Sequence, residues 1–89
     1  MVQAHIVYYG TVQGVGFRYT VQRLALSYHL GGWVKNLSNG AVEALIEGPK
    51  QSIEQLFKNV EERFDGYIRD KNVQFSPALG GFKKFRIIS

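Results

Sequence analysis

The sequence contains no cysteine, which excludes disulfide bonds, thiolate metal sites and a cysteine nucleophile. It also lacks a long apolar run, and no charged N-terminal segment precedes one, so neither a membrane span nor a secretory signal is indicated. His5 and His29 are isolated, and no carboxylate pair or histidine cluster offers ligands to a metal. We therefore expect a cytoplasmic chain without disulfides, bound metal or membrane attachment.

The composition is typical of one small globular domain spanning residues 1–89. Apolar residues make up 45% and aromatic residues 13%, so the chain has enough apolar surface to build a core. The net charge of +4 suits an anionic ligand. Apart from the run at residues 83–86, however, the basic residues are scattered, which also fits an ordinary solvated surface.

Hydrophobic periodicity predicts the order β-α-β-β-α-β. An alternating pattern indicates strands, and the Asn39-Gly40 pair indicates a hairpin turn between two of them. Helical stripes begin at Phe17 and after Gly48-Pro49, and we expect them to end before Gly31-Gly32 and at Asp65-Gly66. The expected strands cover residues 4–12, 33–36, 41–47 and 72–75, with a last extended segment at 82–88.

Two short helices cannot cover both faces of a small sheet, so they should pack side by side on one face. This arrangement is an α+β, ferredoxin-like βαββαβ sandwich with an antiparallel sheet of strand order 4-1-3-2. The first and second strands are then parallel, with the third between them, and a short extra C-terminal strand is possible at the edge. The strand boundaries between residues 65 and 81 are the least determined by the pattern.

Residues 10–18, Gly-Thr-Val-Gln-Gly-Val-Gly-Phe-Arg, have the composition of an anion-binding loop. Glycines let successive backbone N–H groups turn toward one point, and a helix that starts just after them adds its own N–H groups and dipole. Arg18 adds a guanidinium that matches phosphate oxygens two at a time. No Gly-Lys-Ser/Thr follows, so this is not a nucleotide P-loop. The plainer alternatives are an ordinary strand-to-helix connection and an arginine in a surface ion pair.

Asn36 is the second candidate, at the predicted end of the second strand. The carboxyl ends of two parallel strands lie at the same edge of a sheet, so Asn36 and the glycine loop can meet there. The alternative is that Asn36 only shapes the following turn. Residues 10–18 contain no serine, cysteine or histidine, so a covalent phosphoryl-enzyme has no obvious nucleophile.

These residues resemble both signatures of the acylphosphatase family. Residues 10–18 are similar to G-x-V-Q-G-V-x-F-R, and residues 32–36 with Gly40, Val42 and Gly48 are similar to the second signature. The ending Phe85-x-Ile87 is also similar. Tyr8 and residues 64–67 depart from the family pattern, which affects packing and late strand boundaries rather than the site.

The resemblance implies hydrolysis of acyl phosphates to a carboxylate and inorganic phosphate, with no cofactor or metal. It implies that Arg18 holds the phosphoryl group and that Asn36 positions the attacking water. It also implies a small-molecule acyl phosphate as substrate and phosphate as product. Independently of the resemblance, we expect no nucleic acid or membrane partner, and a monomer. The backbone N–H groups that would bind phosphate belong to Gly14, Val15, Gly16, Phe17 and Arg18.

The residue types suit that reaction. A carboxylate leaving group needs no general acid, and phosphoryl transfer depends on positioning and charge stabilisation. One alternative is an RNA-binding module, but the third predicted strand has two acids and none of the aromatic residues that stack bases. Another is an acylphosphatase-like domain of a hydrogenase-maturation carbamoyltransferase. Because the sequence stops at Ser89 without a linker, we expect a free-standing enzyme.

Overall fold

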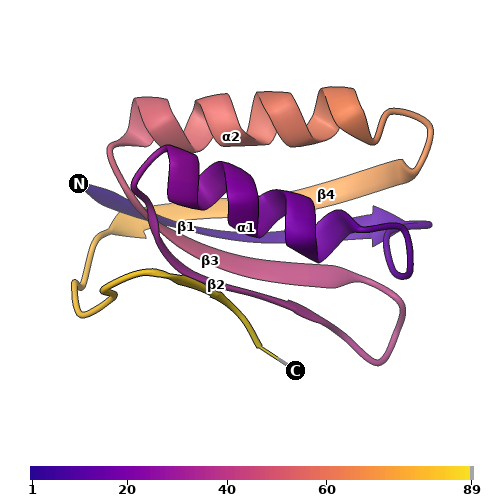
Figure 1. Ribbon diagram of the computed structural model, residues 1–89, viewed down its shortest axis with the longest axis horizontal. Helices are drawn as coiled ribbons and strands as arrows, with labels where there is room; N and C mark the ends of the chain where they lie inside the picture. Colours follow the sequence, from indigo (N-terminus) through magenta and orange to yellow (C-terminus); the bar gives the residue numbers. More distant parts are fainter. Residues whose placement is uncertain (89) are drawn as a thin grey trace.

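The computed structural model describes residues 1–88, which form two helices lying on one face of a five-stranded sheet (Figure 1). The order of elements along the chain is the predicted one, followed by a short additional strand. The elements are β1 (Val2–Gly10), α1 (Phe17–Ser27), β2 (Gly31–Asn36), β3 (Val42–Gly48), α2 (Lys50–Arg63), β4 (Ile68–Pro77) and β5 (Phe85–Ile87).

The strands lie in the order β4-β1-β3-β2-β5, which confirms the predicted ferredoxin-like arrangement and the extra C-terminal strand. Pairs β1–β3, β1–β4 and β2–β3 are antiparallel, whereas β5 runs parallel to β2. The sheet is therefore mixed rather than purely antiparallel. Its parallel edge brings the end of the chain beside β2, which carries Asn36.

Several boundaries differ from the predicted ones. Gly31 and Gly32 begin β2 instead of ending the preceding helix, and His29, at φ 58°, takes the left-handed position after α1. β4 has 10 residues and pairs with β1 along its length, although the pattern indicated a short strand at 72–75. Most side chains of this edge strand are exposed, so backbone pairing specifies it without a hydrophobic alternation.

The core lies between the helices and the sheet, where β1 contributes Ala4, Ile6 and Tyr8 from alternate positions. Phe17, the first residue of α1, is 1% exposed and packs between aromatic neighbours. Its ring centroid lies 5.2 Å from that of Tyr8 and 4.7 Å from that of Phe64. Burial of Phe17 thus fixes where α1 starts, and with it the end of the glycine loop.

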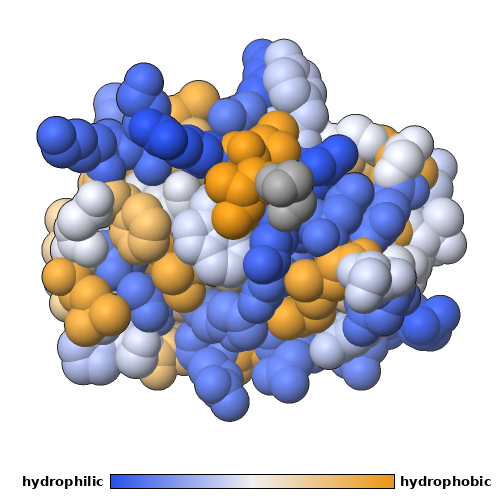
Figure 2. All heavy atoms as spheres, turned by 90° about the horizontal axis from the view of Figure 1, so that it is seen from below, coloured by the Kyte–Doolittle hydropathy of each residue, from blue (hydrophilic) through white to orange (hydrophobic). Residues whose placement is uncertain are grey.

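The opposite face of the sheet is open and mostly hydrophilic, with small separated hydrophobic patches (Figure 2). Polar pairs cross this face between strands: Gln3 donates to Glu47 at 2.8 Å, and the His5 ring lies 2.6 Å from a Glu43 oxygen. Lys35 lies 3.7 Å from the other Glu43 oxygen. These pairs leave the open face hydrated, while the helix layer seals the core.

Candidate active site

The glycine loop leaves the sheet at the end of β1 and enters α1. Thr11 N–H donates to the carbonyl of Tyr67 at 2.9 Å, which anchors the start of the loop to the α2–β4 connection. Gly14 and Gly16 have φ of 77° and 81°, in the left-handed region that favours glycine. Gly16 is also the N-cap of α1, with no side-chain cap. The glycines therefore turn the backbone sharply just before the helix begins.

The backbone N–H groups of residues 14–18 donate no hydrogen bond to any part of the chain that the structure describes. Unpaired N–H groups at a helix start, combined with the positive end of its dipole, form an anion-binding site. Thr20 closes the first turn, because its N–H and its hydroxyl both donate to the Gly16 carbonyl, at 3.1 and 2.9 Å. The loop is thus prepared for a negatively charged group.

Arg18 and Asn36, the two predicted catalytic residues, line the same small hollow of about 140 Å³. Arg18 comes from the first turn of α1 and Asn36 from the last residue of β2. Within residues 1–88, Arg18 takes part in no ion pair. The full lining comprises Val12, Gly14, Gly16, Phe17, Arg18, Tyr19, Asn36 and Ile87.

The side-chain oxygen of Asn36 is buried and accepts no hydrogen bond from residues 1–88. An unpaired buried acceptor costs about 1–3 kcal/mol, so such groups are normally satisfied by water or a ligand. Asn36 is one of the residues that line the hollow with Arg18, so a water bound to its side chain would lie beside that hollow. Among the described residues, Asn36 Oδ1 is the buried side-chain oxygen or nitrogen that has no hydrogen-bond partner, so water or a ligand would satisfy it.

Gln13 joins the two halves of the hollow, and sequence reasoning gave it no role. Its Nε2 donates to the carbonyls of Leu37 at 2.7 Å and Ala41 at 2.9 Å. Leu37 directly follows Asn36, so Gln13 ties the glycine loop to the turn that begins at Asn36. The available signal was a lone polar amide between Val12 and Gly14, in a loop of otherwise small and apolar residues.

Ile87 was also not predicted to lie at the site. It comes from β5, whose parallel pairing with β2 places the last strand beside the hollow. Within residues 1–88, no group of three or more histidine, cysteine, aspartate or glutamate side chains could hold a metal ion. No helix in this part of the chain is long and apolar enough to cross a membrane.

Comparison with known proteins shows the family of this chain. A model of the acylphosphatase family matches residues 4–87. The acylphosphatase of Bacillus licheniformis is 41% identical over 88 residues, which is 98% of each chain. The chain belongs to the acylphosphatase family. This membership makes it a hydrolase that acts on acyl phosphates.

Solved structures agree with this acylphosphatase assignment. The acylphosphatase of Bacillus subtilis superimposes with a TM-score of 0.92 at 41% identity, over 100% of both chains. Full-length HypF, in its phosphate- and nucleotide-bound form, matches with a TM-score of 0.79 at 30% identity. The match covers 100% of this chain but 12% of HypF, so an acylphosphatase fold also occurs within a much larger protein.

Proposed function

We propose that residues 1–89 form a single acylphosphatase-like domain that hydrolyses acyl phosphates without a metal, using Arg18 and Asn36. The observation that carries the proposal is that one hollow is lined by residues with an unpaired guanidinium, with unpaired N–H groups and with an unpaired buried amide oxygen. The first two are donors suited to a phosphoryl group, and the third is an acceptor suited to water. We expect the protein to act as a cytoplasmic monomer.

Arg18 and the N–H groups of residues 14–18 bind the phosphoryl oxygens in this proposal. In a loose phosphoryl-transfer transition state, charge is spread over the equatorial oxygens, and fixed donors around them lower the barrier. A guanidinium offers two parallel N–H donors, and the helix start offers several more. This donor set is cationic and carries no carboxylate, so it supplies directly the charge neutralisation that a metal supplies in other phosphoryl-transfer enzymes.

Asn36 orients the attacking water through its side-chain oxygen. The water oxygen forms a bond to phosphorus as the bond between phosphorus and the acyl oxygen breaks, and the carboxylate leaves with that electron pair. A carboxylate has a pKa of about 4, so it needs no proton from an acid. The proton of the water passes to the phosphate that is being formed. Positioning is therefore the main task of the protein.

The open face of the sheet supports the expectation that nucleic acid is not a partner. Glu43 and Glu47 lie on this face of the central strand β3, where RNA-binding relatives of the fold need aromatic residues. The charge of the partly exposed Glu43 would oppose a phosphate backbone, whereas Glu47 is buried beside Leu79 and Gly80.

Hydrolysis of benzoyl phosphate in the presence of a chelator tests the proposed function. We expect the purified wild-type protein to be active. We expect Arg18→Ala to lose about 10³-fold or more in kcat/KM, because the bound substrate and the transition state both lose their contact with the guanidinium. Arg69→Ala is the matched control, since Arg69 is exposed on β4. A wild-type protein without activity, or an Arg18→Ala variant as active as the control, would refute the proposal.

A further inference from the structure

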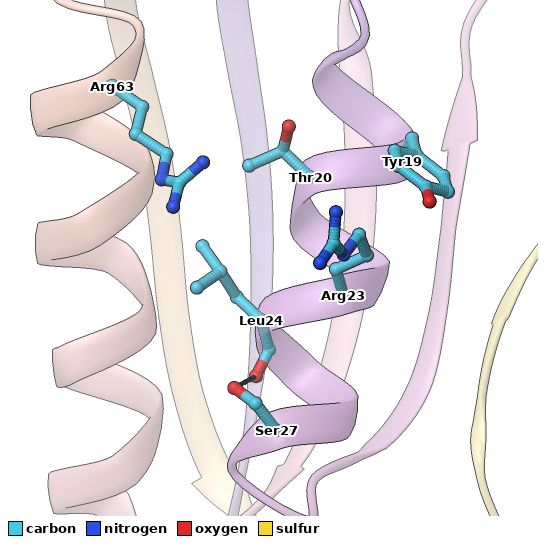
Figure 3. A pocket seen from close by; sticks show the side chains of 6 residues that line it. All are labelled: Tyr19, Thr20, Arg23, Leu24, Ser27 and Arg63. Atoms are coloured by element: carbon cyan, nitrogen blue, oxygen red, sulfur yellow. Dashed lines mark hydrogen bonds between the residues drawn. The ribbon is translucent and has the colours of Figure 1, made fainter.

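A second hollow, of about 230 Å³, lies between the two helices and is distinct from the candidate active site. Its lining comprises Tyr19, Thr20, Arg23, Leu24, Ser27 and Arg63. Figure 3 shows Arg63 reaching from α2 toward α1, where Thr20 and Leu24 point into the same gap and Arg23 lies along its border. Two guanidinium groups from two different helices therefore border one hollow.

These guanidinium groups have no acidic partner in the described part of the chain. The ion pairs among residues 1–88 lie elsewhere, and the lining of this hollow contains no carboxylate. Arg23 instead stacks over the ring of Tyr19, with its guanidinium carbon 5.6 Å from the ring centroid, which leaves its N–H groups free. Two arginines without a counter-charge favour an anion, and planar guanidinium groups suit carboxylate or phosphate oxygens in particular.

The hydroxyl groups of Thr20 and Ser27, which line the hollow, already donate within the protein. Thr20 donates to the carbonyl of Gly16 at 2.9 Å, and Ser27 donates to that of Leu24 at 2.8 Å, as drawn in Figure 3 for the second pair. They are therefore not available as donors to an anion. The positive charge that would attract an anion here comes from Arg23 and Arg63, so two substitutions can test the hollow.

Tyr19 connects this hollow to the candidate active site, because its side chain lines both. Arg23 follows Arg18 by five residues, which is about 7.5 Å along the helix axis and about 140° around it, so Tyr19 lies between the two arginines on the helix surface. A substrate that reaches from one arginine to the other must therefore curve around α1 past Tyr19. A substrate whose phosphoryl group sits at Arg18 can therefore extend past Tyr19 toward Arg23 and Arg63.

We propose that Arg23 and Arg63 form a subsite for a second anionic group, carboxylate or phosphate, on the acyl part of the substrate. The proposal rests on the proposed function, since it places the phosphoryl group of the same substrate at Arg18. It predicts a preference for acyl phosphates with an acidic far end over those with a neutral one. Arg23 and Arg63 then determine specificity and take no part in the bond-breaking step.

The ratio of kcat/KM for succinyl phosphate to kcat/KM for acetyl phosphate measures this preference directly. We expect the double variant Arg23→Gln, Arg63→Gln to lower the value for succinyl phosphate about five- to tenfold, because exposed charge pairs each contribute modestly. The value for acetyl phosphate should change less than twofold. The double variant Lys58→Gln, Lys84→Gln is the matched control, since it removes two positive charges from exposed positions outside the hollow, and it should leave the ratio unchanged.

Three results would overturn the subsite. The first is an unchanged ratio in the arginine double variant. The second is an equal change in the lysine double variant, which would indicate a general effect of net charge. The third result would show that the hollow binds a separate anion rather than a part of the substrate. In that case free succinate, at constant ionic strength, would change the rate of acetyl phosphate hydrolysis in the wild type but not in the arginine double variant. Failure of the proposed function is separate, because the wild-type protein would then hydrolyse neither substrate.

Discussion

At the scale of single residues, Gln13 connects the glycine loop that precedes Arg18 to the turn that follows Asn36. It thereby helps to fix the distance between these two predicted catalytic residues. One amide nitrogen donates to two carbonyls of the turn after β2, at 2.7 and 2.9 Å, while its backbone belongs to the glycine loop. Arg18 and Asn36 lie on opposite sides of that connection. In phosphoryl transfer a small displacement of the nucleophile relative to the phosphorus is costly, so this bridge matters for turnover.

We predict that Gln13→Ala lowers kcat about 10- to 100-fold in benzoyl phosphate hydrolysis. The affinity for inorganic phosphate, measured by calorimetry, should change less than threefold, because Arg18 and the N–H groups remain. Gln74→Ala, on exposed β4, is the control for loss of an amide. Equal losses of kcat and phosphate affinity would show that the loop as a whole has moved, and Gln13 would then have no separate positioning role.

The sequence predicts Arg18 and Asn36 but not Gln13, for a physical reason. Arg18 and Asn36 stand at the ends of elements whose parallel course can be derived from the strand order. The partners of Gln13 are backbone carbonyls 24 and 28 residues away, and carbonyls carry no residue-specific signal. Ile87 was missed similarly, because the parallel pairing of β5 with β2 leaves no periodicity in a three-residue strand.

At the scale of elements, the segment between β4 and β5 is tied to the sheet by one buried carboxylate. Glu47, 8% exposed, accepts hydrogen bonds from the N–H groups of Leu79 at 2.9 Å and Gly80 at 3.1 Å, and from Gln3 at 2.8 Å. Hydrogen bonds to a charged acceptor are stronger than neutral ones. Glu47 thus holds the connection that delivers β5 to the edge of the sheet.

We predict that Glu47→Ala lowers the free energy of unfolding by about 2–4 kcal/mol, because three donors lose their acceptor. Urea denaturation followed by circular dichroism measures this change. Glu43→Ala is the comparison on the same strand and face, and it should cost about 1 kcal/mol or less since that side chain is more exposed. Equal effects of the two substitutions would contradict the anchoring role.

The predicted strand boundaries were wrong at the two edge strands, β4 and β5. β1 and the first five residues of β3 alternate buried and partly buried positions, and both strands were placed to within two residues of their ends. β4 runs from Ile68 to Pro77 with two partly buried positions, so its length comes from pairing with β1, which a single-strand pattern cannot reveal. The sequence pattern left the strand boundaries between residues 65 and 81 undetermined for this reason.

At the scale of the whole molecule, the fold depends on a helix layer packed over one face of the sheet, and the Tyr8 side chain reaches from β1 to that layer. Its side chain is 2% exposed, and its hydroxyl donates to Glu61 at 3.0 Å. Burial, followed by the Glu61 charge and the hydrogen bond to it, raises the pKa of Tyr8 well above its ordinary value of 10.0. The folded protein therefore keeps this hydroxyl protonated in conditions where the unfolded chain releases the proton.

We predict that the stability contributed by neutral Tyr8 is fully present below pH 10 and declines as the pH rises above it. Release of one proton on unfolding lowers the free energy of unfolding by about 1.4 kcal/mol per pH unit. Urea denaturation between pH 9 and pH 11 should show a smaller decline in Tyr8→Phe than in the wild type. Parallel declines in the two proteins would show that Tyr8 is not the titrating group.

The layered architecture was predictable because it follows from the number and the amphipathic character of the helices, not from individual contacts. Hydrophobic periodicity gives the order β-α-β-β-α-β, and two helices, each with one apolar face, are expected to pack on the same side of the small sheet. The topology then brings the end of β1 and the end of β2 to one edge. The candidate site is a consequence of the fold at that edge.

The central claim is that Arg18 and the loop bind the phosphoryl group while Asn36 acts on water alone. Its most direct test measures, for Asn36→Ala and the wild type, both kcat for benzoyl phosphate and the affinity for inorganic phosphate. We predict that kcat falls about 10²- to 10³-fold while phosphate affinity stays within twofold. A parallel loss of both, or a variant with unchanged kcat, would contradict this division of roles.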